Sequence, residues 1–320
     1  MMDVLNLALP FFGLIFLGYA CGRIKQIPDA GLAWMNFFLI YVALPVLFYR
    51  ILAKTPFEKL ANAPFVVATT LATASIFAIS FAIGLMLRKG NPREATITGL
   101  AGAYGNVGYM GPGLALATLG PEAAVPVALI FCFDNMLLFA LVPTLMALAE
   151  RGKMPPGAAA LDVVKRIALH PFIIATVAGV VAAATHFEAP VAIDRLMEFL
   201  QNAAAPCALF ALGVTVALRP LESVPWEVPP IVLMKLVAHP LAVLALLWAL
   251  GPMPEVWVYT GFMMAALPPA LNVFIMARQY DTWVQQASGA VLIGTLASVV
   301  TLTAAMLMVK MRLLPDVLFQ

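Results

Sequence analysis

The chain has 320 residues, of which 63% are hydrophobic and only 11% are charged, with a formal net charge of +2. A typical soluble domain has roughly 25% charged residues, so a soluble globule with this composition could not cover its surface with polar groups. Apolar runs of about 20 residues recur from end to end, which predicts an all-α polytopic membrane protein.

The same composition excludes several other classes of protein. No basic block indicates a nucleic-acid partner, and the alternating pattern of an outer-membrane barrel is absent. The three cysteines, Cys21, Cys132 and Cys207, are far apart and lie in apolar runs, so we interpret them as packing residues and expect neither a metal nor a cofactor. The first apolar run has no basic segment before it, and we interpret it as a retained helix rather than a signal peptide.

Turn and charge clusters divide the chain into ten predicted spans. In chain order these are 3–22, 31–53, 64–87, 94–118, 121–149, 163–186, 190–218, 228–250, 255–279 and 283–311. The longest polar stretch, 150–162, separates a first half, 1–149, from a second half, 163–311, and we expect it to be a short cytoplasmic linker. The tail 312–320 resembles in part the remnant of an expression-tag protease site and carries no functional argument.

The distribution of Lys and Arg predicts the orientation of these spans. With the N-terminus outside, the inside loops hold eleven basic residues and the outside segments hold six. Both termini are therefore expected outside.

A weak internal repeat relates the two halves. With an offset of 161 residues, Pro10 matches Pro171, Gly18 matches Gly179 and Pro45 matches Pro206. Because five spans is an odd number, the second copy would be inserted upside down. Inverted repeats of this kind are typical of secondary transporters, with a substrate site at the midplane.

The fourth span contains a predicted break. Glycine occupies every third position from Gly99 to Gly111, including Gly108, and Pro112 follows. Glycine costs roughly 1 kcal/mol and proline about 3 kcal/mol in a helix interior. Either small residues allow tight helix packing here, or the helix opens at a substrate site with Asn106 beside it.

The ninth span has a matching break. Pro268 and Pro269 are adjacent in mid-span, and Asn272 follows three residues later. Paired interruptions in corresponding spans point to a transport site. The N-termini of the half-helices would favour an anion, and the amides of Asn106 and Asn272 could donate and accept hydrogen bonds.

Ionisable residues inside spans form a second candidate group. Asp134 and Asn135 lie in the fifth span, and Lys235 and His239 lie four residues apart in the eighth. Such residues usually pair and face a cavity. Asp134 and Lys235 are expected to pair, with His239 as a proton site or ligand donor; a static buried pair with His239 bonded to a carbonyl freed by Pro240 remains the alternative.

These motifs resemble those of the auxin efflux carrier family. The resemblance rests on the segments 105–112, 265–274, 277–280 and 169–171 and covers essentially the whole chain. It implies two inverted five-helix repeats whose broken fourth and ninth helices cross. Spans three to five and eight to ten would form a moving transport domain, and the other four a scaffold. In the plant members a long hydrophilic loop separates the halves, and here only 150–162 stands in its place.

The resemblance also implies an elevator-like carrier of small organic anions. Asn106, Gly108, Gly111 and Pro112 would form the first part of the substrate site, and Pro268, Pro269 and Asn272 the second. Gln201 and Asn202 in the seventh span could contact substrate from the scaffold, whereas Arg50 is better explained as an interfacial anchor.

The predicted function is therefore transport of mono- or dicarboxylates or auxin-like acids, secondary active or facilitative. The alternative is a sodium-coupled symporter of larger organic anions on the bile-acid-carrier-like fold. An intramembrane enzyme is disfavoured because HExxH, GxSxG and facing aspartate pairs are absent. The sequence leaves open whether a proton or sodium is the coupling ion, and whether the chain forms a homodimer.

Overall fold

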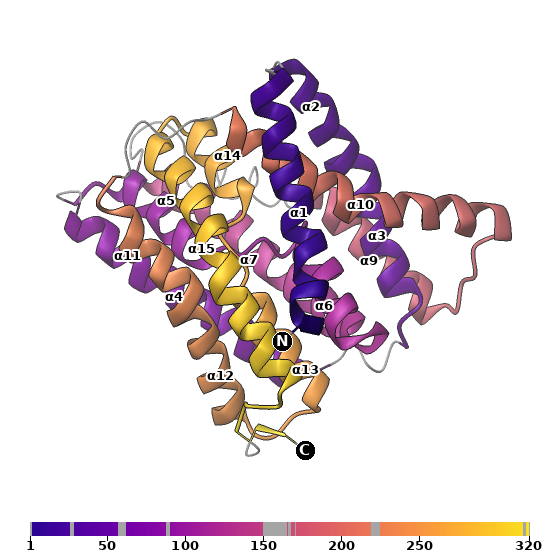
Figure 1. Cartoon of the computed structure of the whole chain (residues 1–320). Coiled ribbons are helices and arrows are strands. Elements are labelled where there is room, and N and C mark those ends of the chain that lie inside the picture. Colours follow the sequence, from indigo (N-terminus) through magenta and orange to yellow (C-terminus); the bar gives the residue numbers. More distant parts are fainter. Residues whose placement is uncertain are drawn as a thin grey trace. The chain divides into compact units, whose positions relative to one another are not determined.

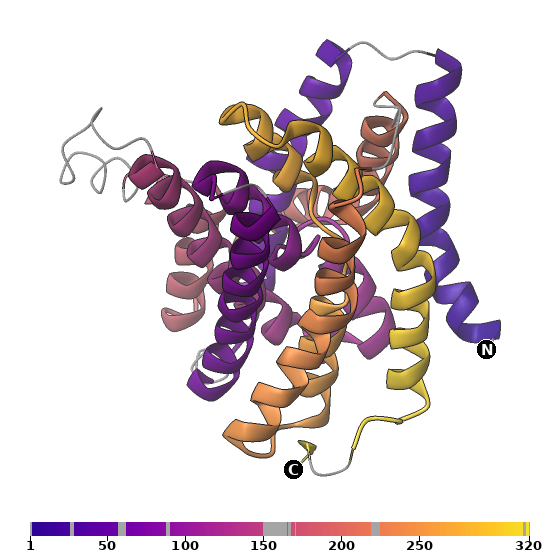
Figure 2. The same ribbon diagram turned by 90° about the vertical axis from the view of Figure 1, so that its left-hand side faces the viewer.

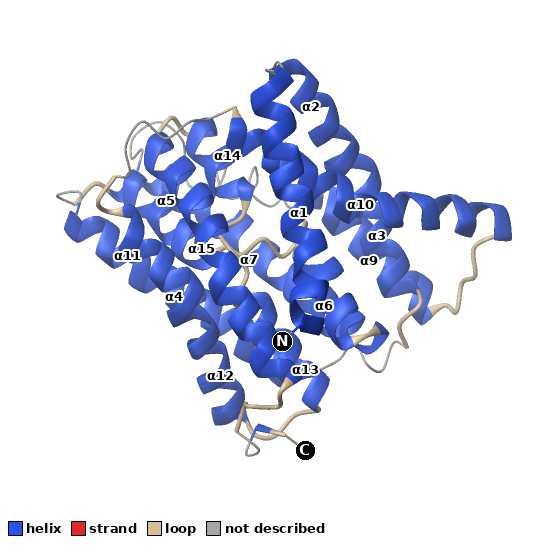
Figure 3. Ribbon diagram, in the orientation of Figure 1, coloured by secondary structure: helices blue, strands red, loops and turns tan. Residues whose placement is uncertain are grey.

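The computed structural model describes residues 2–25, 29–56, 62–87, 90–149, 165, 168–169, 171–218, 225–315 and 318–319. Within these residues the regular secondary structure is helical and no strand is present (Figure 3). The proposed linker 150–162 lies outside the described residues, as does part of the tail.

The chain folds into two compact units, each built from both halves of the sequence. Unit 1 contains residues 1–62, 108–132 and 169–220, and unit 2 contains 63–107, 133–168 and 221–320. Unit 1 therefore collects the expected scaffold spans together with the second half of the fourth span and the beginning of the fifth. The chain passes from unit 2 to unit 1 between Val107 and Gly108, inside the predicted break.

The helices of unit 1 follow the predicted segments closely. They are α1 (Met2–Lys25), α2 (Asp29–Phe38), η1 (Leu39–Ala43), α3 (Leu44–Ala53), α6 (Gly111–Leu119), η3 (Pro121–Ala123), α9 (Pro171–Ala184) and α10 (Val191–Ala217). Helix α7 (Ala124–Ala149) begins in unit 1 and continues in unit 2.

Unit 2 contains the remaining helices. They are α4 (Ala63–Leu87), α5 (Pro92–Ala103), α11 (Val228–Leu233), η4 (Met234–Ala238), α12 (His239–Leu250), α13 (Glu255–Ala265), α14 (Leu271–Gln279) and α15 (Val284–Lys310). Figure 2 shows α15, in yellow, as one helix without interruption, whereas α13 and α14 are separate helices within the predicted ninth span.

Six helical segments among the described residues are long and apolar enough to cross a membrane. These are Gly31–Ala53, Ala63–Leu87, Pro121–Ala149, Val191–Ala217, Val228–Leu250 and Val284–Lys310. The fourth and ninth predicted spans are each divided into two short helices, and α9 is a shorter apolar helix.

Two of the long segments contain a π-helical turn directly before a proline. The turn η1 precedes Leu44-Pro45, and η4 precedes His239-Pro240. Proline lacks an N–H and clashes with the carbonyl four residues earlier. A wider π turn accommodates both effects without ending the helix, and it fixes the directions of Lys235 and His239.

Close helix packing in unit 1 depends on glycine. Helix α1 packs along α10 (Figure 1), and a Cβ at Gly18 would collide with the backbone of Phe210. Helix α9 packs on α3 in the same way, since a Cβ at Gly179 would lie 2.9 Å from the carbonyl oxygen of Tyr49. The expected repeat pairs Gly18 with Gly179, and both glycines serve the same purpose.

In unit 2, α4 packs against α5 through small residues. A Cβ at Gly99 would lie 3.1 Å from Phe77, and one at Gly102 would collide with Ser80. Two glycines of the predicted break therefore lie in the regular helix α5, where they allow close packing. For this part of the glycine run the packing alternative describes the structure, and the opening begins after Ala103.

Candidate functional site

The first break lies between α5 and α6. Helix α5 ends at Ala103, and Tyr104 has extended backbone angles of −83° and 102°. Helix α6 begins at Gly111 with Pro112 in its first turn, where a missing N–H costs no hydrogen bond. The helix therefore opens between Tyr104 and Met110, before Pro112 rather than at it.

The second break lies between α13 and α14. Helix α13 ends at Ala265, and α14 begins at Leu271 after an extended N-cap residue, Ala270. Pro268 and Pro269 occupy the opened segment, because the residue before a proline is disfavoured in the helical conformation.

The two opened segments pair with each other in unit 2. Gly105 and Pro269 form an antiparallel bridge. The Asn106 N–H donates to the carbonyl of Pro268 at 2.8 Å, and the Ala270 N–H donates to the carbonyl of Tyr104 at 3.0 Å. The bridge needs no N–H from Pro269 itself. These N–H and carbonyl groups, released from the helices, are thus satisfied inside the protein, as a membrane requires.

Tyr104 connects the crossing to a neighbouring helix. The Asn272 amide donates to the Tyr104 hydroxyl at 3.1 Å, and this hydroxyl donates to the side-chain oxygen of Asn135 on α7. Asn106 and Asn135 are buried, whereas Asn272 is half-buried. Amide and hydroxyl groups that can both donate and accept therefore surround the crossing.

Lys235 is the cation at this crossing. Its side chain is fully buried, and its ammonium donates to the carbonyl of Ala265, the last residue of α13. A Cβ at Gly105 would lie 3.2 Å from the Lys235 ammonium nitrogen, so the lysine lies against the backbone of the first break. A positive charge at a helix C-terminus also interacts favourably with the helix dipole.

A direct ion pair between Asp134 and Lys235, expected from the sequence, is not present among the described residues. The carboxylate of Asp134 accepts from the Thr73 hydroxyl at 3.0 Å, and Lys235 donates to Ala265. The two charges still interact electrostatically at a longer distance. The physical reason is that the break exposes a carbonyl that binds the ammonium more directly.

His239 has a hydroxyl partner in the structure, whereas the alternative interpretation of the sequence gave it a backbone carbonyl freed by Pro240. Its Nε2 lies 3.2 Å from the Thr73 hydroxyl, and its Nδ1 has no partner among the described residues. Thr73, Asp134 and His239 therefore form one buried cluster at α4, α7 and the start of α12.

The remaining predicted site residues belong to unit 1. Gly111 and Pro112 are buried in the first turn of α6, Gly108 is half-buried and Asn202 is exposed on α10. A Cβ at Gly108 would lie 3.1 Å from the ring of Phe131. The structure thus places eight of the twelve predicted site residues in unit 2: Asn106, Asp134, Asn135, Lys235, His239, Pro268, Pro269 and Asn272.

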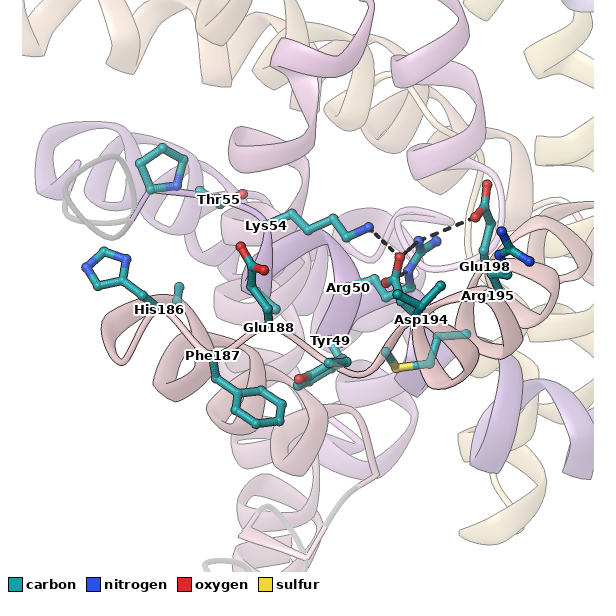
Figure 4. Close-up of a pocket in the computed structure, with 16 residues that line it drawn as sticks. Tyr49, Arg50, Lys54, Thr55, His186, Phe187, Glu188, Asp194, Arg195 and Glu198 are labelled. Carbon is teal, nitrogen blue, oxygen red and sulfur yellow. Dashed lines mark hydrogen bonds and ion pairs between the residues drawn. The ribbon is translucent and has the colours of Figure 1, made fainter.

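A polar pocket of about 780 Å³ lies in unit 1 between the end of α3 and the start of α10. Arg50 is buried there and forms two hydrogen bonds to Asp194, both at 3.0 Å, and one to Gln201 at 2.8 Å (Figure 4). Lys54 also donates to Asp194, at 3.1 Å. Arg50 therefore joins α3 to α10, and Gln201 takes part in this network, a role that the sequence did not indicate for Arg50.

Sequence reasoning missed two residues of the crossing region. Tyr104 bonds both Asn272 and Asn135, and Thr73 bonds both Asp134 and His239. A tyrosine inside a glycine-rich run was a usable signal for the first. Thr73 carried no signal, because threonines in apolar helices usually bond their own backbone, as Thr69 does.

A family model described as "Membrane transport protein" matches residues 3–306, nearly the whole chain. The chain belongs to this family, the auxin efflux carrier family. A relative from Rhizobium meliloti (strain 1021), named "Putative malonate transporter", is 49% identical over 319 residues, and the match covers 100% of each chain. The match to the family model therefore confirms the resemblance noted in the sequence, and the family is one of membrane transporters.

One prediction concerns the geometry of this carrier's crossing. A Cβ at Gly294 on α15 would collide with the ring of Pro269, whereas one at Gly13 on α1 would meet nothing within 4 Å. Gly294→Ala should therefore destabilise the protein by about 1–3 kcal/mol through overpacking. Gly13→Ala should be neutral or stabilising by up to about 1 kcal/mol. Thermal unfolding in detergent compares the two; equal midpoints would contradict the close approach of α15 to Pro269.

Proposed function

We propose that this protein is a secondary transporter of small organic anions, with malonate as the first candidate. The observation that carries the proposal is the Gly105–Pro269 crossing of two broken helices, surrounded by buried amide, hydroxyl and ammonium groups. The full-length relative named as a malonate transporter supports the choice of substrate.

The chemistry of the crossing suits a dicarboxylate. Carboxylates accept hydrogen bonds, and the second N–H of the Asn272 amide and the first N–H groups of α14 are donors. The Tyr104 hydroxyl gives its one hydrogen to Asn135 and positions the Asn272 amide. Lys235 places a positive charge beside the same backbone, and the N-terminus of α14 adds the positive end of a helix dipole. Hydrogen bonds to a charged ligand contribute roughly 1.5–3 kcal/mol each.

Uptake into proteoliposomes tests this function. Vesicles loaded with unlabelled malonate should exchange it for external labelled malonate, whereas vesicles without protein should not. Acetate, succinate and an auxin-like aromatic acid, offered as competitors, define the substrate class. Absence of exchange for every one of these acids would contradict the proposal, and exchange that requires sodium would favour the sodium-coupled alternative.

We also propose the ten-helix inverted repeat for the fold. In such a repeat the contact of the first span with the seventh is equivalent to that of the sixth with the second. The structure has both contacts, α1 on α10 and α9 on α3, with glycine at matching positions in each. We place the protein in the bacterial inner membrane with both termini outside, as the distribution of Lys and Arg indicates.

For the transport mechanism we propose an elevator, and a disulfide can test which helices move. A Cβ at Gly113 on α6 would lie 3.3 Å from the Cβ of Ala205 on α10. In disulfides the two Cβ atoms are typically about 3.5–4.5 Å apart, so this pair is close enough to be linked. In a background with Cys21, Cys132 and Cys207 replaced by alanine, Gly113→Cys with Ala205→Cys should cross-link on oxidation.

If α6 moves relative to α10 during transport, the cross-link should abolish malonate exchange. Reduction of the disulfide should then restore the exchange. Each single cysteine variant serves as a control. Unchanged exchange by the oxidised protein would contradict movement of α6, which would then belong to the stationary body together with the rest of unit 1.

A further inference from the structure

A buried hydroxyl links a carboxylate to an imidazole in the interior of unit 2. The Thr73 hydroxyl on α4 lies 3.0 Å from an Asp134 carboxylate oxygen and 3.2 Å from Nε2 of His239. The three side chains are 1%, 3% and 2% exposed. The proposed substrate chemistry at the crossing does not use this cluster.

A hydroxyl has one hydrogen, so its two contacts depend on where protons are. If Thr73 donates to ionised Asp134, then Nε2 of His239 must carry a hydrogen and donate to the Thr73 oxygen. If Thr73 donates to His239 instead, then Asp134 must be protonated and donate to Thr73. The cluster is therefore satisfied in both arrangements, and they differ in which residue holds a proton.

Few other titratable groups face this cluster. Helix α4 has none, and Lys235 is the only one of η4. Glu227, which is buried just before α11, lies eight residues before Lys235, or about 12 Å along a helix. The titratable residues of the other elements packed around α4, α7 and α12 are Arg93 and Glu94 at the start of α5, Tyr104 just after it, Cys132 on α7, and Glu255 and Tyr259 on α13.

We propose that Asp134, Thr73 and His239 carry the proton that couples transport, so that the carrier moves its anion together with a proton. This inference rests on the proposed function, because it names the ion that accompanies the substrate. His239 Nδ1, buried and without a partner among the described residues, is the atom at which the proton arrives.

In the proposed proton transfer, each bond that breaks is matched by a bond that forms. A proton from one aqueous side binds Nδ1 and makes His239 a cation, while Asp134 is ionised. The Nε2–H bond then breaks as an O–H bond forms on Thr73, and the original Thr73 hydrogen forms an O–H bond on Asp134. The net result is neutral His239, protonated on Nδ1, and neutral Asp134. On release to the other side these steps run in reverse: Asp134 returns a hydrogen to Thr73, Thr73 returns its own to Nε2, and Nδ1 then loses its proton, which restores the first state.

Lys235 connects this cluster to the crossing. It precedes His239 by four residues across the π turn, and its ammonium binds the carbonyl of Ala265 at the second break. A proton added to the cluster, first on His239 and then on Asp134, makes the cluster more positive and disfavours the nearby ammonium, whereas an anion at the crossing attracts the ammonium. Proton and anion therefore favour each other's binding, and this favourable coupling is reciprocal.

The test uses purified full-length protein in proteoliposomes, labelled malonate as the probe, and valinomycin with potassium to hold the membrane potential at zero. With one proton per malonate, a pH gradient of about one unit supports about tenfold accumulation. A dye that reports internal pH should record proton movement with malonate, and a sodium gradient alone should give no accumulation.

Thr73→Val removes the linking hydroxyl. When normalised to each variant's exchange rate at equal pH, the accumulation driven by the pH gradient should fall by about tenfold in Thr73→Val and should be retained in Thr73→Ser. Thr69→Val is the matched control. Thr69 lies one turn earlier on α4 and is buried, but its hydroxyl donates to the carbonyl of Phe65. This variant should accumulate malonate like the wild type.

Exchange by the wild type without accumulation in a pH gradient would overturn the proton assignment and leave the proposed function intact. Unaltered accumulation by Thr73→Val would overturn it too. If that variant does not fold, or if malonate is not exchanged at all, infrared difference spectra of the wild-type protein decide. A buried carboxylic-acid band that changes with pH and is lost in Asp134→Asn supports the assignment, and absence of any such band in the wild type overturns it.

Discussion

Asn106→Ala and Asn272→Ala should each lower the affinity for malonate by about tenfold or more while the protein stays folded. Losing one hydrogen bond to a charged ligand costs roughly 1.5–3 kcal/mol, and each 1.4 kcal/mol is a factor of about ten. Asn272→Ala also removes the amide that donates to the Tyr104 hydroxyl at 3.1 Å. Titration of purified protein in detergent with labelled malonate measures both affinities.

Gln279→Ala is the matched control for this experiment. Gln279 is the last residue of α14, the helix that Asn272 begins, and it is exposed. This variant should bind malonate like the wild type. If both asparagine variants also bind like the wild type, the substrate does not contact the crossing.

Lys235→Met should have the second large effect, on stability. It leaves the Ala265 carbonyl without its donor and leaves Asp134 as a lone charge in the interior of unit 2. Leaving a buried charge uncompensated typically costs about 3–5 kcal/mol. Adding Asp134→Asn to Lys235→Met should recover part of this loss, because the remaining charge is removed while a partner for Thr73 is kept.

A double-mutant cycle on thermal unfolding measures this coupling. Lys25→Met, at the exposed end of α1, controls for the loss of a lysine. Because the ammonium and the carboxylate interact at a distance rather than as a contact pair, the coupling should be smaller than the cost of Lys235→Met alone. Strict additivity would show that the two charges do not interact.

Much of the helix arrangement could be predicted from the sequence, since apolar length and turn clusters are local signals. The predicted segment 64–87 differs from α4 by one residue at its start, and 190–218 differs from α10 by one residue at each end. The two breaks were predictable because Pro268-Pro269 and the glycine run act on the backbone directly.

The pairing within the candidate site could not be predicted in the same way. Which peptide of the first break meets Pro269 depends on tertiary packing, and the register places Gly105 there rather than Gly108. Lys235 was expected to bind Asp134, but charge alone does not reveal a carbonyl released by a nearby break. Arg50 was taken for an interfacial residue because its partner Asp194 is distant in sequence.

The bridge between the two breaks has a consequence for how the protein is made. The backbone of Asn106 bonds that of Pro268, and Ala270 bonds Tyr104, so the first break has its partners only after the ninth span is synthesised. Until then its polar backbone is exposed to lipid or to the insertion machinery, at a cost of several kcal/mol for each unsatisfied group. The N-terminal half expressed alone should therefore be a substrate for membrane proteases, and supplying the second half as a separate polypeptide should protect it.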